Sequence, residues 1–195
     1  MNSEQRSQIL RTGLLAGIAA WLVGYAATYV LVAPDVRDSP LHRFIEAFNE
    51  EAATYEMVGW VFYNAHFVNT IFRDVPIVGS QTTSFLGGED GFSAALYLIP
   101  AGVLLATGLA LARYHGVTNT TDGGFVGATV VPTYLLASIV GVYAFEVTVG
   151  SARGAPDLLP AIFLAGIVFP LIFAGGGGAL GGGVGNRDES RRVAR

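Results

Sequence analysis

Apolar residues gather along this chain in four long stretches that polar segments separate. The stretches cover approximately residues 12–33, 92–112, 125–147 and 158–184. Each one holds roughly the 20 apolar residues that a helix needs to cross a hydrocarbon core about 30 Å thick. Because that core contains no water, backbone amides must bond within their own segment, and a helix satisfies this requirement. The pattern predicts an all-α fold: a single membrane domain over residues 1–195, built as an integral membrane bundle of four transmembrane helices.

The polar segment between the first two stretches, residues 34–91, predicts an extracellular amphipathic or interfacial helix. Ser39 followed by Pro40 is typical of an N-cap and a first helical residue. Apolar residues then recur at steps of three and four, namely Leu41, Phe44, Ile45, Phe48, Ala52, Tyr55, Gly59 and Phe62. His42 and Glu46 lie one turn apart and away from this stripe, which indicates a solvated face of the helix.

Aromatic residues are concentrated in the continuation of this helix, residues 57–72. As a helix the segment reaches about 24 Å, short of a full crossing, and tryptophan and tyrosine favour the headgroup level of a membrane. We expect an interfacial or re-entrant segment. The alternative is a fifth span, which would put the two termini on opposite sides of the membrane. The glycine-rich and polar residues 75–91 that follow predict an irregular loop.

The charged residues indicate a habitat and an orientation. All 11 basic residues are arginine, there is no lysine, and 15 acidic residues give a net charge of -4. This balance argues against a nucleic-acid partner, which requires a basic face, and is typical of a surface kept hydrated at high salt. Near the spans, seven arginines lie on the side of the N-terminus and four on the other. The positive-inside rule therefore predicts a multi-pass protein of the cell membrane with both termini cytoplasmic.

Small residues recur along the fourth stretch. Gly166, Gly178 and Gly182 belong to a four-residue repeat with Pro170 and Ala174, and Gly177 and Gly181 form a neighbouring row. Faces of this kind let helices approach closely and drive their association in lipid. They predict helix packing and, as partners, copies of the same chain or another subunit of a membrane complex. The charged tail, residues 186–195, is expected to be disordered.

Few residues suggest chemistry. Glu146 is the one ionisable residue within a predicted span, and such groups are functional candidates because a buried charge is expensive. It lies close to the outer end of its span, however, and no continuous polar stripe accompanies it. The other candidates lie in the aromatic segment: Trp60, Asn64, His66 and Asn69. Without cysteine, a histidine cluster or a nucleophile–base pair, we expect no enzyme, no metal and no cofactor.

With its lysine-free acidic composition, four spans, acidic outer loop containing Gly59 to His66 and glycine-dense last span, the chain resembles the uncharacterised small multispan membrane proteins of haloarchaea. Some of those proteins are loosely labelled transporters, and the resemblance supplies no catalytic residues. Two functions remain open at this point. One is a small oligomeric transporter or channel-like protein of unknown substrate. The other is a non-catalytic structural or accessory membrane subunit that docks a partner through its outer loop.

Overall fold

The computed structural model describes residues 3–49, 53–75, 79–88 and 91–193, and the chain forms two compact units. Unit 1 comprises Met1–Leu22, Pro100–Ala137 and Gly166–Arg195, and unit 2 comprises Val23–Ile99 and Ser138–Ala165. The long helix α1 (Ser3–Asp38) contributes to both.

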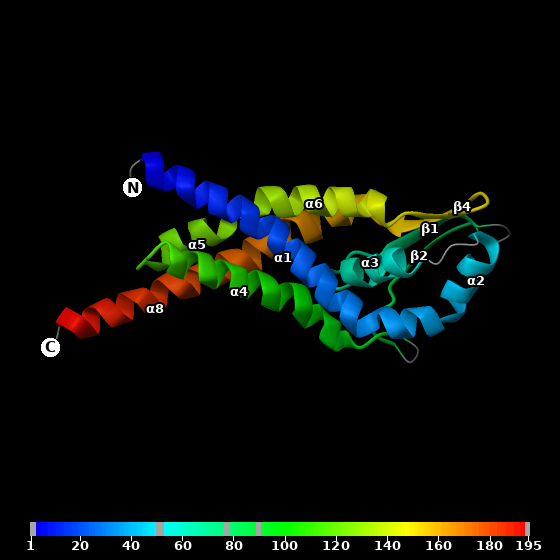
Figure 1. Cartoon of the computed structure of the whole chain (residues 1–195), viewed down its shortest axis with the longest axis horizontal. Coiled ribbons are helices and arrows are strands. Elements are labelled where there is room, and N and C mark those ends of the chain that lie inside the picture. The colour runs from blue at the N-terminus through cyan, green and yellow to red at the C-terminus, as the bar shows by residue number, and fades with distance from the viewer. Residues whose placement is uncertain (1–2, 50–52, 76–78, 89–90, 194–195) are drawn as a thin grey trace. The chain divides into compact units, whose positions relative to one another are not determined.

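In the described part of the chain, four helical segments are long and apolar enough to cross a membrane, as the hydrophobic pattern predicts. They are Ser3–Asp38, Ala94–Tyr114, Thr120–Ala144 and Leu158–Val184. The second consists of a 3-10 turn η1 (Ala94–Tyr97) and α4 (Leu98–Tyr114), and the third of α5 (Thr120–Ala128) and α6 (Val131–Ala144). The fourth consists of α7 (Leu158–Pro160), the π-helical segments η2 (Ala161–Val168) and η3 (Pro170–Ala174), and α8 (Gly175–Val193). Figure 1 shows these elements along the chain.

Prolines mark the interruptions of these helices. Pro132 follows the break between α5 and α6 at Thr129 and Val130, and Pro170 begins η3. Proline has no amide hydrogen to donate, so it is best tolerated at the start of a helical element. α8 continues through the residues 186–193 that were predicted to be disordered. Extending an existing helix requires no new nucleation, which favours this continuation.

In unit 1, glycines bring α8 against two neighbouring helices of the same chain. A Cβ on Gly177 would lie 2.0 Å from the carbonyl oxygen of Leu105 in α4, and Gly181 approaches the same helix. Gly178 and Gly182 face the other way, toward α5 and its N-cap Asn119, with comparable distances. Figure 1 shows α5 beside α8. Both glycine rows are therefore covered within the chain, and Gly166 is buried as well.

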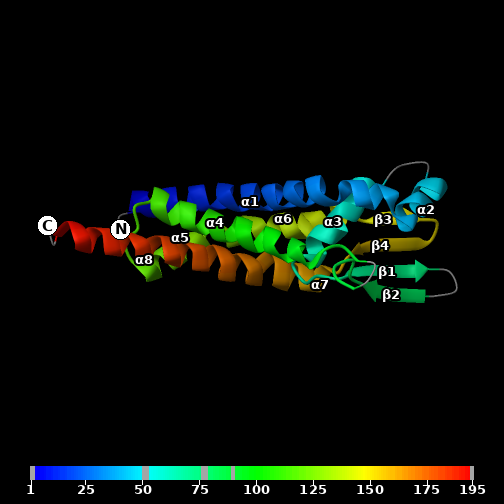
Figure 2. The same cartoon turned by 90° about the horizontal axis from the view of Figure 1, so that it is seen from below.

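In unit 2, a four-stranded antiparallel sheet corrects the all-α prediction. Its strands are β1 (Thr70–Val75), β2 (Gly79–Thr83), β3 (Val147–Val149) and β4 (Ala152–Pro156), in the order β2-β1-β4-β3 (Figure 2). Three of them have five residues or fewer, too short for a clear alternation, and β4 is poor in residues with high strand propensity. They form because β1 pairs with β4, which lies about 80 residues farther along the chain.

Between α1 and β1 the described residues form the helices α2 (Pro40–Asn49) and α3 (Thr54–Asn64). The amide of His42 donates to Ser39 Oγ at 3.2 Å, which confirms the predicted N-cap. The expected solvated face is wrong for His42: its side chain is buried, and Nε2 lies 2.9 Å from Thr54 Oγ1. The imidazole meets Thr54, the first residue of α3, and periodicity within one helix cannot show such a contact.

The aromatic segment, residues 57–72, is not one helix. α3 ends at Asn64, Phe67 adopts a left-handed backbone conformation with φ 59°, and β1 begins at Thr70. A fifth span is therefore excluded. We call α2, α3 and the sheet the headpiece; its fully buried side chains include Trp60 and Phe62.

Candidate functional site

Trp60 of α3 contacts three other segments of unit 2. Its side chain is 1% exposed, and Nε1 donates a hydrogen bond of 2.7 Å to the carbonyl of Phe145, just beyond α6. The ring meets Phe72 of β1 edge-on, with centroids 5.4 Å apart, and lies nearly parallel to Phe85 at 6.0 Å. Tryptophan is well suited to this position because its large apolar ring carries one donor that a buried carbonyl can satisfy.

Two glycines permit this close packing. A Cβ on Gly59 would lie 2.3 Å from the ring of Phe145, and one on Gly154 in β4 would lie 3.0 Å from the indole of Trp60. A larger residue at either position would force α3 away from the segments that it contacts. Close packing against Phe145 therefore explains why a glycine directly precedes Trp60 in the sequence.

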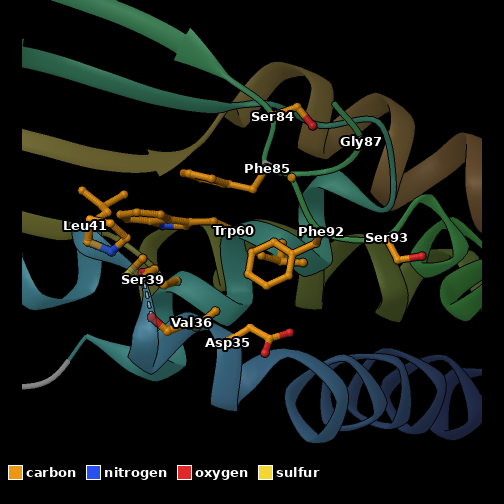
Figure 3. A pocket seen from close by; sticks show the side chains of 14 residues that line it. Asp35, Val36, Ser39, Leu41, Trp60, Ser84, Phe85, Gly87, Phe92 and Ser93 are labelled. Atoms are coloured by element: carbon orange, nitrogen blue, oxygen red, sulfur yellow. Dashed lines mark hydrogen bonds between the residues drawn. The ribbon is translucent and has the colours of Figure 1, made fainter. Parts of the chain in front are cut away.

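Trp60 also lines an open cavity of about 590 Å³, which we call the Trp60 cavity. Its walls come from the end of α1, the start of α2, α3, and the loop between β2 and η1: Asp35, Val36, Ser39, Pro40, Leu41, Met57, Trp60, Val61, Ser84, Phe85, Gly87, Gly91, Phe92 and Ser93. Figure 3 shows the Phe85 ring facing the Trp60 ring, with Asp35 and Ser93 toward the edge. Asp35 carries the charge among these lining residues. The cavity is therefore aromatic and aliphatic inside, with a small polar rim.

Asn64 fixes the loop that forms one wall of this cavity. Its side-chain amide donates to the carbonyl of Val68 at 2.8 Å, and its Oδ1 accepts from the amide of Phe85 at 2.7 Å. A longer contact of 3.4 Å joins Nδ2 to Thr70 Oγ1. These bonds tie the C-terminus of α3 to β1 and to the loop that carries Phe85. Asn64 therefore has a structural role: its bonds hold the cavity wall in position.

His66 is fully buried next to this turn. Nδ1 donates to the carbonyl of Phe62 at 2.8 Å, and the Phe62 ring meets the imidazole edge-on with centroids 4.7 Å apart. Burial lowers the pKa of His66 from 6.5 to about 4, against the opposing effect of the hydrogen bond. The imidazole is consequently neutral near pH 7.

The other two candidates lie at the sheet. Asn69 is exposed, and its backbone carbonyl accepts from the amide of Asp157 at 2.9 Å. Glu146 lies beyond the end of α6 at Ala144, and its Oε1 is 3.9 Å from a guanidinium nitrogen of Arg153 in β4. Trp60 therefore lines the cavity and Asn64 holds Phe85 in its wall, whereas Glu146 lies elsewhere in unit 2, outside the helix.

Sequence reasoning missed most of the cavity wall. Phe85 lies in the segment that was predicted to be an irregular loop, and Phe92 was assigned to the start of the second apolar stretch. Asp35 belongs to α1, which passes Pro34 and ends at Asp38. A usable signal was the placement of two phenylalanines on either side of Gly87 and Gly91 in an otherwise polar segment. Large apolar side chains in such a loop need a partner surface, and Trp60 supplies it. Among the described residues, no three histidine, aspartate or glutamate side chains come together as metal ligands.

A protein-family model described as a family of unknown function (DUF7978) matches residues 1–185. The match covers the four apolar helices and the headpiece together. No curated protein and no solved structure matches the chain. The function must consequently be argued from the cavity and its surroundings.

Proposed function

The chain belongs to this family of unknown function, and from the geometry of the headpiece we propose that it is a non-catalytic accessory subunit of a membrane complex. In this proposal four helices anchor the protein, and the Trp60 cavity receives an apolar segment of a partner membrane protein. The observation that carries the proposal is the cavity itself, with its aromatic walls held in place by the bonds of Trp60 and Asn64.

The walls of the cavity favour apolar side chains as the occupant. Its volume of about 590 Å³ is within the range of binding pockets, and a rigid aromatic lining lets an incoming leucine or aromatic side chain bury its surface. Leu41 connects the cavity to the exposed face of α2, where Phe44 and Phe48 are 55% and 65% exposed with ring centroids 4.7 Å apart. A partner that filled the cavity and also covered α2 would remove this adjoining apolar surface from water.

The setting that we propose is a membrane of a halophilic archaeon, with both termini on the cytoplasmic side. Support comes from the four apolar helices, the excess of arginine on the terminal side of the predicted spans, and the acidic, lysine-free composition. In this orientation the headpiece lies outside the cell.

A small transporter or channel-like protein of unknown substrate is the second candidate. It is supported by the interruption of the third span at Thr129 and Val130, because broken helices form the substrate sites of many transporters. Glu146 no longer supports it, since the carboxylate lies beyond α6 and pairs with Arg153. The accessory function therefore explains more of the structure.

The absence of cysteine allows a sharp test of docking. Asp35 lines the cavity, and Asp38 is exposed on the same turn of α1 outside the lining. Asp35→Cys and Asp38→Cys remove the same charge and each introduce a single thiol for a photoactivatable crosslinker. We expect Asp35→Cys to crosslink in native membranes to an apolar segment of one membrane protein, identified by mass spectrometry, and Asp38→Cys to crosslink far less.

Filling the cavity supplies the complementary measurement. Asp35→Trp should abolish copurification of that partner, whereas Asp38→Trp should retain it. Equal crosslinking from both positions, or copurification that survives Asp35→Trp, would overturn the docking proposal. Solute flux in proteoliposomes of the purified chain, unaffected by Asp35→Trp, would establish the transporter in its place.

A further inference from the structure

The face of the sheet that points away from Trp60 carries a row of polar side chains. Antiparallel pairing sets Arg73 of β1 directly opposite Arg153 of β4, and Arg153 directly opposite Thr148 of β3. Residues directly opposite each other project to the same face. The neighbouring positions Phe72 and Gly154 project to the opposite face and approach Trp60. Two guanidinium groups are therefore presented together on the exposed side of the sheet.

This row forms part of a second cavity of about 570 Å³, which we call the arginine cavity. Beside the row, it is lined by Val142 and Tyr143 from the last turn of α6 and by Leu158, the first residue of α7. Those residues end the third candidate span and begin the fourth. If the two helices cross a membrane as proposed, the cavity lies at the level of the lipid headgroups. The exposed Tyr143 fits this level, which tyrosine favours.

The charges in the arginine cavity are unevenly paired. Arg153 has Glu146 at 3.9 Å, but the guanidinium of Arg73 forms no ion pair or hydrogen bond with any residue in the described part of the chain. Asp74 also lines the cavity, from a bulged position with φ 55°, and it does not pair with Arg73 within 4.0 Å. Like charges directly opposite each other on a sheet destabilise it. An anion between Arg73 and Arg153 would relieve this repulsion.

We propose that the arginine cavity binds the phosphodiester of a membrane phospholipid. The guanidinium groups of Arg73 and Arg153 donate to the phosphate oxygens, a geometry for which the planar arginine fork is well suited. The carboxylates of Glu146 and Asp74 balance the two cations, so a singly charged phosphodiester is favoured over a more highly charged free phosphate. The apolar residues at the span ends then contact the glycerol and the first methylenes of the lipid. This inference rests on the proposed membrane location and is independent of docking at the Trp60 cavity.

The test measures lipid bound to the full-length chain. The protein is purified in detergent, titrated with phosphatidylglycerol, and analysed by native mass spectrometry at one fixed salt concentration. We expect Arg73→Gln and Arg153→Gln each to weaken binding about tenfold, as the loss of a charge-assisted hydrogen bond would. Arg43→Gln is the matched control, because Arg43 is exposed in the same unit and does not line the cavity. Glu146→Gln releases Arg153 and should tighten binding by a few-fold.

Three further results complete the test. Arg73→Lys should bind with intermediate affinity, because it keeps the charge without the fork, and this keeps the test decisive if one glutamine variant unfolds. Asp35→Trp should leave lipid binding unchanged, which separates this proposal from docking. Equal binding by Arg73→Gln, Arg153→Gln and Arg43→Gln would overturn the site. Inorganic phosphate that binds as tightly as the lipid and displaces it would overturn the lipid as its occupant and indicate a soluble anion.

Discussion

Replacing Gly178 with alanine tests the packing of α8 against α5. The added Cβ would lie 2.1 Å from the carbonyl oxygen of Gly123 and 3.0 Å from the amide nitrogen of Gly127. Both atoms belong to the backbone, which cannot rotate away as a side chain can, so the helices must separate by about 1 Å. Gly176 is the matched control on the same helix, because its Cβ would meet nothing within 4 Å.

The difference between the two variants isolates the cost of this clash. Each substitution gains about 1 kcal/mol of intrinsic helix propensity, so this contribution cancels between them. Overpacking costs about 1–3 kcal/mol. We therefore expect Gly178→Ala to be about 1–3 kcal/mol less stable than Gly176→Ala. For a chain of this size each kcal/mol corresponds to about 2–4 °C in the midpoint of thermal unfolding.

The assay is thermal unfolding in one detergent, followed by tryptophan fluorescence at one scan rate, so that any irreversible unfolding affects both variants in the same way. Gly176→Ala should unfold at or slightly above the temperature of the unmodified chain, and Gly178→Ala several degrees below Gly176→Ala. Coincident transitions for the two variants would refute the reasoning, because they would mean that α5 and α8 do not approach through their backbones at this position.

The headpiece supports three further predictions. The folded chain protonates His66 only near pH 4, whereas the unfolded chain does so below about 6.5, so stability present at neutral pH is lost as the pH falls through this window. The loss from pH 6.5 to 5 is about 2 kcal/mol, and His66→Gln should flatten the pH dependence of the urea midpoint there; an unchanged slope contradicts the assignment. Trp60→Phe leaves the carbonyl of Phe145 without its donor and should lower the free energy of unfolding by about 1–3 kcal/mol, measured by urea unfolding against the unmodified chain. Asn64→Leu deprives the amide of Phe85 and a second backbone group of partners and should cost more, about 2–4 kcal/mol; equal midpoints for the Trp60 and Asn64 variants would argue against two lost bonds.

The candidate site could be predicted only in part. Trp60 and Asn64 were identifiable because polar and amphipathic groups in an aromatic segment are unusual. In the structure Trp60 lines the cavity and Asn64 binds the backbone of Phe85 in its wall. Their partners could not be predicted, since Phe85 and Phe145 lie about 25 and 85 residues away along the chain. His66 illustrates a different limit: its residue type suggested proton chemistry, and only its burial shows that it stays neutral near pH 7.

The helices, too, could be predicted only in part from the sequence. Length and continuous hydrophobicity determine the four apolar segments, because crossing a hydrocarbon core imposes a requirement on each segment separately. The glycine rows of α8 were visible as a repeat, but their neighbours were not. The contacts of Gly177 with α4 and of Gly178 with α5 show that these rows are used within one chain. The same repeat in sequence would also serve contacts between copies.

The sequence by itself determined the properties that belong to single segments: the four apolar helices, the N-cap at Ser39, the acidic lysine-free surface and the density of small residues in the last span. The tertiary structure decided the four-stranded sheet, the burial of His42, the Trp60 cavity and the alignment of Arg73 with Arg153. The physical reason is that hydrophobicity and capping act over one turn or one span, whereas strand register and cavity walls depend on contacts between residues distant along the chain. Both proposed binding sites arise from contacts between residues that are distant along the chain.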